Sequence, residues 1–406
     1  MNMDQLVRDT LIEQGAQPQT PPPDLAGRVL AVRRRRRTRR ISGVAVAAVL
    51  AVAAAVAVPV LDRGGDEPRL ASGMNRSDII AHPDQSPPRD LIAAGDTALA
   101  AYYVMDMVRK TDDRAVAVRD YHLLDQRTGK YVRTTDWSVV DVAPGMRTAA
   151  VLERELPARR IGLLDLLSGK VEHWIPVDRG VAGVAFSPDG DKLVATTYDE
   201  NPDLRLRADY DNDGDGRKND WMPQFGGSSR TGFYVLDVDT GDGSWARVAG
   251  GDQEHLNARQ DFAFSGDGGL VYSGLTTAPH QRYYDFEGKE ADTPAKERHL
   301  HWFVDARLSP DGSLAAGEFA GGSRATASEI LDPLTGKRLH KVPGQQLLAW
   351  ADDDRLVAWD IEPGANEFHN RLVLVTIGSD KVVPLSGFRK GNDGAGGRWT
   401  PLFARR

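Results

Sequence analysis

Two turn signals recur in a fixed order along most of this 406-residue chain. The first has the form Ser-Pro-Asp-Gly or a close variant, and it follows short apolar runs that end at Ile92, Val142, Phe186, Phe264, Leu308 and Trp350. The second has the form Leu-Asp-x-x-Thr-Gly-Lys or a variant, and its copies begin at Leu124, Leu164, Leu236, Tyr284, Leu331 and Ile377. Copies of the first signal are 42 to 50 residues apart, except for one step of 78. This repeated pattern of turns predicts a structural repeat that is built of tight β-hairpins.

Each repeat holds two hairpins and therefore four short strands, which is the size of one blade of a β-propeller. The expected fold class is all-β, a single β-propeller of six blades over residues 91–406. A seventh blade would require residues 398–403 and the segment before residue 91 to complete another sheet. The 78-residue step places an acidic insertion at about residues 198–231. With 41 Gly and 23 Pro, the chain is poorly suited to a helical bundle.

The two signals carry a family resemblance. The Ser-Pro-Asp-Gly turn followed by Leu-Asp-x-x-Thr-Gly-Lys resembles the blades of TolB-type, WD-repeat-like bacterial propellers, over about three quarters of the chain. The chain departs from that family because it has an uncleaved-looking membrane anchor and no obvious small N-terminal domain. The protein-translocation role of the family is therefore not carried over.

The N-terminal part predicts a membrane anchor. Residues 41–61 are uncharged and mostly Ala and Val, which is long enough for a helix to span a hydrocarbon core of roughly 30 Å. Arginines at 33–37, 39 and 40 precede this segment, and such clusters stay in the cytoplasm. We therefore expect a basic cytoplasmic tail over residues 1–40 and one transmembrane helix over residues 41–61. The alternative is a secretory signal cleaved at Ala55-Val56-Ala57, although signal n-regions are shorter than this head.

Beyond the helix, residues 62–90 are rich in Pro and Gly and predict an extended stalk that leads to the propeller. The expected location is the cell membrane, with a single span, the N-terminus in the cytoplasm and the propeller outside. This plan resembles membrane-anchored propellers of actinobacteria. The absence of Cys excludes disulfides and thiolate metal sites. The arginine cluster fits a membrane flank better than a nucleic-acid surface, so no nucleic-acid partner is expected.

A candidate calcium site lies in the insertion. Acidic residues alternate there in an Asp-x-Asp-x-Asp-Gly pattern that can gather carboxylates around one hard cation, and they are Asp209, Asp211, Asp213, Asp215 and Asp220. The register that begins at Asp211 resembles the calcium loops of FG-GAP-type propellers, but its last acidic residue, Asp220, comes one position later than in those loops. Neither register shows the flanking helices of an EF-hand. The alternative is a hydrated acidic loop that binds no metal.

The connections between second and third strands form the default binding face of such a propeller. The sequence places them at residues 106–114, 153–159, 198–231, 276–281, 318–326 and 360–370. A binding or scaffold module for an extracytoplasmic protein or envelope ligand is therefore the expected function. The alternatives are an extracellular enzyme acting on glycan or peptide at the propeller axis, and a signalling protein whose tail at residues 1–40 holds a cytoplasmic partner.

Catalytic signals are few. No Gly-x-Ser-x-Gly pentapeptide occurs, which excludes a fused serine-hydrolase domain. His299 and His301 are expected to share one face of a strand, more often a solvated edge than a zinc site. Tryptophans recur near the blade strands and are expected to pack between blades rather than to form a sugar platform; they are Trp137, Trp174, Trp245, Trp302, Trp350 and Trp359.

Overall fold

The computed structural model describes residues 79–209, 211, 219–224, 227–248, 259–275, 277–321, 326–365, 367–389 and 398–406. These residues belong to the larger of two compact units of the chain, Glu67–Arg406. Their regular structure is β-strand, with one short 3₁₀ helix, η2 (Ala295–Glu297), and no α-helix within the described ranges. The all-β prediction is confirmed for this part of the chain.

The predicted membrane segment lies outside these ranges. Residues 1–40 and 41–61, expected to be the tail and the transmembrane helix, are not among the described residues. In the described part of the chain, no helix has the length and apolar character needed to cross a bilayer.

Two sheets are complete four-stranded antiparallel meanders. The first consists of β15 (Ala263–Phe264), β16 (Val271–Gly274), β17 (Gln281–Tyr284) and β18 (Glu290–Ala291). The second consists of β22 (Gln346–Trp350), β23 (Arg355–Ile361), β24 (Asn370–Thr376) and β25 (Val382–Pro384). A third sheet holds β19 (Ala315–Phe319), β20 (Ala327–Leu331) and β21 (Arg338–Pro343). An isolated bridge from Leu308 to Ala315 marks the place of its missing first strand.

A seven-stranded sheet consists of two such meanders that share one long strand. Its strands are β6 (Trp137–Val142), β7 (Thr148–Glu153), β8 (Ala158–Asp165), β9 (Lys170–Phe186), β10 (Lys192–Tyr198), β13 (Arg230–Asp237) and β14 (Gly243–Arg247). The first part of β9 pairs mainly with β8, and its last part, from Val181 to Phe186, pairs with β10. One strand thus ends one meander and begins the next.

The remaining sheet joins segments from both ends of the described chain. It consists of β1 (Ile79–Ile80), β2 (Ala93–Ala94), β3 (Thr97–Arg109), β4 (Arg114–Asp125), β5 (Lys130–Thr134), β11 (Leu204–Arg207), β12 (Trp221–Pro223) and β26 (Trp399–Arg405). β26 pairs antiparallel with β3, from Trp399 opposite Val104 to Arg405 opposite Thr97. The last described strand therefore completes a meander begun by β3, β4 and β5.

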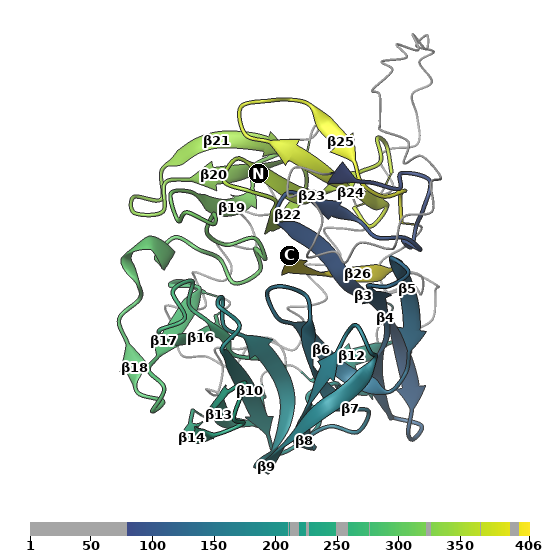
Figure 1. The fold of residues 1–406 in the computed structure, drawn as a ribbon, viewed down its shortest axis with the longest axis vertical. Coiled ribbons are helices and arrows are strands. Elements are labelled where there is room, and N and C mark those ends of the chain that lie inside the picture. The colour runs from purple at the N-terminus through teal and green to yellow at the C-terminus, as the bar shows by residue number, and fades with distance from the viewer. Residues whose placement is uncertain are drawn as a thin grey trace. The chain divides into compact units, whose positions relative to one another are not determined.

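Successive antiparallel meanders, with the last strand built into the first sheet, are the architecture of a β-propeller. Within residues 79–406, Figure 1 shows the sheets following one another in chain order, with β26 beside β3. The described part of the chain therefore has a propeller-type fold.

The predicted turns explain why these strands form where they do. Gly190 of the first signal has φ +84°, and its amide donates a hydrogen bond to Ser187 O at 2.9 Å. In the second signal, the Asp165 carboxylate accepts hydrogen bonds from the amides of Leu167 and Ser168, and Gly169 has φ +69°. Both turns need a glycine because a side chain disfavours positive φ. The turn chemistry inferred from the sequence is confirmed.

The core lies between neighbouring sheets. Trp399 is fully buried, and its ring centroid lies 5.2 Å from that of Trp359. Both belong to a cluster that joins β3 and β26 to the β22–β25 sheet. Trp350 is also buried, so the expected packing of tryptophans between sheets is confirmed at Trp350 and Trp359. The prediction is wrong for Trp302, which is 43% exposed.

Residues 79–90 fall in the range that the sequence assigns to a stalk. In the structure, β1 pairs with β2, and Gln85 is buried with its side-chain amide donating to Asp90 at 2.6 Å. His82 also bridges to Ser386 after β25. This segment therefore packs on the sheets, while residues 62–78 lie outside the described ranges.

Candidate functional site

The connections between second and third strands lie close to the positions expected from the sequence. In the structure they cover residues 110–113, 154–157, 199–229, 275–280, 320–326 and 362–369. The longest, residues 199–229, leaves β10 and returns at β13, as expected for the insertion. Its first strand, β11, pairs with β4 of another sheet, with Leu204 opposite Val116. The insertion is therefore attached to a sheet that it does not come from.

A buried carboxylate anchors this attachment. The Asp203 side chain is 2% exposed and lies between two arginines. Arg119 of β4 donates to both carboxylate oxygens, at 2.8 and 3.2 Å. Arg259, which precedes β15, donates to the same two oxygens at 2.9 and 2.6 Å. Asp203 thus binds the insertion to β4 and to the segment before β15 by bidentate, charge-assisted hydrogen bonds.

The environment keeps Asp203 charged. Burial of its carboxyl raises its pKa, but the guanidinium groups of Arg259 and Arg119 outweigh burial and hold the pKa well below its usual range. Arg259 also donates to Asp261 at 2.6 Å, and Tyr198 of β10 donates to the other oxygen of Asp261 at 2.9 Å. We call Arg119, Asp203, Arg259, Asp261 and Tyr198 the arginine clamp. Sequence reasoning did not identify it, because its members are far apart in the chain and carry no motif.

The candidate calcium ligands lie beyond the clamp, in the loop between β11 and β12. Arg207 pairs with Trp221 at the end of this hairpin, and Ala208 N donates to Asp220 O at 2.9 Å. Asp209 and Asp220 are therefore both at the base of one loop, with Asp211 also described. Asp213 and Asp215 lie outside the described residues. Strands rather than EF-hand helices flank the loop.

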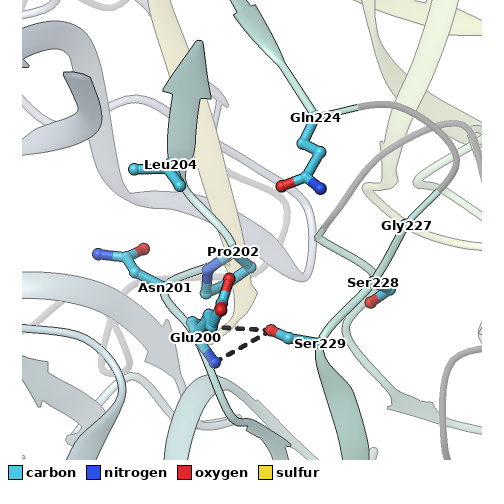
Figure 2. Close-up of a pocket in the computed structure, with 8 residues that line it drawn as sticks. All are labelled: Glu200, Asn201, Pro202, Leu204, Gln224, Gly227, Ser228 and Ser229. Atoms are coloured by element: carbon cyan, nitrogen blue, oxygen red, sulfur yellow. Dashed lines mark hydrogen bonds between the residues drawn. The ribbon is translucent and has the colours of Figure 1, made fainter. Parts of the chain in front are cut away.

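A small polar pocket lies at the start of the insertion (Figure 2). It has a volume of about 250 Å³ and is lined by Glu200, Asn201, Pro202, Leu204, Gln224, Gly227, Ser228 and Ser229. Ser229 Oγ accepts from Glu200 N at 3.1 Å and donates to Glu200 O at 3.2 Å, which joins the two sides of the pocket. The lining is suited to a small polar ligand.

Another exposed group of side chains lies where the chain passes from β18 toward β19. Trp302 and Phe303 are 43% and 42% exposed, and their ring centroids are 5.8 Å apart with the rings at 89°. Asp305 follows two residues later and is also exposed. Sequence analysis placed Trp302 in the core and did not single out Phe303 or Asp305.

The expected histidine strand is not formed. His299 and His301 lie in irregular chain after η2 and do not share a strand face. His299 lies against the turn at Gly336, whereas the His301 ring contacts that of His280, with the ring centroids 4.3 Å apart and the planes tilted by 40°. Among the described residues, no group of three or more His, Asp or Glu side chains is placed to hold a metal ion.

The comparisons with known proteins identify no family. No family model and no curated protein matches the chain. Hydrazine synthase from Kuenenia stuttgartiensis is 14% identical, with 60% of this chain and 64% of that chain covered and a TM-score of 0.31. TolB from Acinetobacter baumannii is 17% identical, with 77% and 68% covered and a TM-score of 0.38. The dihydro-heme d1 dehydrogenase NirN in complex with DHE is 16% identical, with 82% and 71% covered and a TM-score of 0.30.

These likenesses are loose, so the fold assignment rests on the sheets described above, and no activity is taken from the three proteins. The geometry itself provides a clamped insertion with a polar pocket, a loop with acidic residues at its base, and an exposed aromatic pair beside a carboxylate. These features provide surfaces for ligands, which is the chemistry of a binding module.

Proposed function

We propose that this protein is a membrane-anchored, extracytoplasmic binding or scaffold module. Its anchor would be residues 41–61, its basic tail would remain in the cytoplasm, and its propeller would present ligand-binding connections outside the cell. The ligand would be a protein or an envelope component. The charge pattern around residues 33–40 supports this orientation.

We further propose that the propeller has six blades. The strand pairings divide into six groups, each with four strand positions. The groups are β26–β3–β4–β5, β6–β7–β8 with the first part of β9, the last part of β9 with β10–β13–β14, β15–β18, the Leu308 bridge with β19–β21, and β22–β25. β26 then supplies the first strand of the group that contains β3, a common way to close a ring of blades.

The arginine clamp is the observation that carries the binding proposal. A long surface insertion would ordinarily be mobile, and ordering it on binding would cost free energy. Asp203 instead joins the insertion to Arg119 of β4 and to Arg259, which precedes β15. A connection fixed in this way offers a ligand a surface that is already ordered.

Calcium binding by the acidic loop is part of the proposal. The hairpin places Asp209 and Asp220 at the base of one loop, and the sequence puts Asp211, Asp213 and Asp215 between them. Five carboxylates at this spacing suit a hard cation with oxygen ligands. Extracytoplasmic modules typically bind calcium at about 0.1 to 1 mM.

Isothermal titration of the full-length chain with calcium tests this part. We expect binding near the millimolar range, loss of binding in Asp213→Ala, and weaker binding in Asp209→Asn and Asp220→Asn. Asp239→Asn, in the exposed turn between β13 and β14, is the matched control and should bind calcium normally. Absence of heat with the unaltered chain would contradict the calcium site and leave the clamped insertion as the binding surface.

Protease added to intact cells tests the orientation. We expect the bulk of the chain to be cleaved from outside while an epitope placed within residues 1–40 survives until the membrane is ruptured. Protection of the propeller in intact cells would contradict an extracytoplasmic location.

A further inference from the structure

Trp302 and Phe303 are exposed aromatic residues whose rings meet at nearly a right angle, and other residues pack against them. We call this pair the aromatic corner. Their rings are 89° apart and 5.8 Å between centroids, so they present two faces at nearly a right angle. Trp302 lies against Gly274 of β16, where an added Cβ would be 2.8 Å from the Trp302 Cβ. The His301 ring lies 5.4 Å from the Phe303 ring, and it packs in turn against the His280 ring at 4.3 Å. The corner is therefore held by its neighbours while its faces meet solvent.

Five other indoles of this chain differ from Trp302 in one respect, while Trp350, which is buried, and Trp137, which is half-buried, resemble it in this respect among the described residues. An arginine guanidinium lies over the ring at 4.0 Å for Trp174, 3.7 Å for Trp245, 3.8 Å for Trp359, and 5.8 and 5.9 Å for Trp221 and Trp399. In the described ranges, no arginine or lysine lies over Trp302, although its exposure leaves the ring accessible. The electron-rich face that attracts cations elsewhere in the molecule is thus available to a ligand.

Asp305 adds a negative charge beside the corner. Its carboxylate accepts a hydrogen bond from Gln346 Nε2 at 3.2 Å, and the same amide group contacts Phe303 O at 3.4 Å. Within the described residues, no arginine or lysine is paired with Asp305. The side chain reaches solvent, and a carboxyl group in water is ionised at neutral pH. At neutral pH it is therefore an anion with no positive partner in the described part of the chain.

We infer that Trp302, Phe303 and Asp305 form a binding site for an organic ammonium group. Ring faces attract a cation within about 6 Å of their centroids, and the attraction increases where water is partly excluded. The Asp305 carboxylate supplies the opposite charge, while the apolar substituents of the ammonium cover the two rings. A neutral apolar ligand would leave the charge of Asp305 without an opposite charge, so charge complementarity favours the cation. The site is separate from the acidic loop and does not depend on calcium.

Titration calorimetry of the full-length chain in the presence of a calcium chelator tests the inference. The probe is choline, and its neutral isostere 3,3-dimethylbutan-1-ol has the same shape without the charge. We expect choline to bind in the millimolar range, about −4 kcal/mol, and the isostere to bind at least about tenfold more weakly. A parallel titration with Nα-acetyl-lysine methylamide compares a small quaternary ammonium with a lysine side chain. Whichever of the two binds more tightly identifies the source of the ammonium group.

Variants locate the site. Trp302→Ala and Asp305→Asn should each weaken choline binding by about fivefold or more, whereas Trp302→Phe keeps an aromatic face and should retain part of the affinity. Leu334→Ala and Asp239→Asn are exposed apolar and acidic controls from other turns and should change nothing. Unchanged thermal midpoints would show that the variants are folded. The inference is wrong if neither cation binds up to about 50 mM, if the isostere binds equally well, or if Trp302→Ala binds as the unaltered chain does.

Discussion

Asp203 shows how one carboxylate can join segments that lie far apart along the chain. Its oxygens accept hydrogen bonds from two guanidinium groups and are almost fully excluded from water. A buried ion pair of this kind adds little stability compared with an apolar replacement, but removing one partner is costly because the other charges remain buried. Its value is therefore in fixing where the insertion lies.

Replacing this carboxylate should destabilise the protein. Asp203→Asn leaves Arg119 buried without its counter-charge and Arg259 with Asp261 alone, and we expect the free energy of unfolding to fall by about 3 to 5 kcal/mol. Because the folded-state pKa of Asp203 is lowered, this contribution is present at neutral pH and is lost as the pH falls below about 4. Urea denaturation at pH 7 and at pH 3 measures both effects. A loss below about 0.5 kcal/mol at pH 7, comparable to a surface change such as Asp239→Asn, would contradict the role given to the clamp.

At the scale of elements, the sequence predicts local structure well and long-range pairing poorly. Gly190 and Gly169 lie in turns whose residue types reveal the hairpins, because turn chemistry is local. The pairing of β11 with β4 has no such local signal, since it depends on where a long insertion reaches in space. The same reason hides the arginine clamp. Trp302 was assigned to the core because residue type alone does not distinguish a buried indole from an exposed one.

The β11–β12 hairpin separates the acidic loop from the clamp, so the loop should be removable. Replacing residues 208–220 with Asn-Gly joins Arg207 to Trp221 by a two-residue turn that suits their antiparallel pairing. We expect the thermal midpoint without calcium to change by no more than about 3 °C, because loop length affects stability weakly. Stabilisation by calcium should disappear. Scanning calorimetry with and without calcium measures both outcomes, and a midpoint lowered as much as in Asp203→Asn would contradict the separation of loop and clamp.

At the scale of the whole molecule, the pairing of β26 with β3 joins residues about 300 positions apart. Thr97 Oγ1 donates to Ala404 O at 3.2 Å across this pair, and Arg406 donates a side-chain hydrogen bond to Gly95 O at 2.8 Å. Trp399 fills the space between this sheet and the β22–β25 sheet. Both hydrogen bonding and core packing therefore depend on a short segment.

Deleting residues 398–406 should abolish cooperative folding. The edge of β3 would be left unpaired, and the cluster around Trp359 would lose its largest member. We expect a broad, low-temperature transition and aggregation, observed by circular dichroism and size-exclusion chromatography. A chain with the same segment scrambled is the matched control and should behave like the deletion. Normal melting of either chain would contradict a ring that depends on β26.

The position of β26 in the chain also affects how the protein folds during translation. When a ribosome has just released β3, β4 and β5, their sheet still lacks β26, the strand that covers β3, and β26 is translated only after all of β6–β25. Unprotected edges of this kind invite association with other nascent chains. A frameshift near codon 398 should therefore be about as harmful as one within β6–β25, because both leave the edge of β3 without its partner strand.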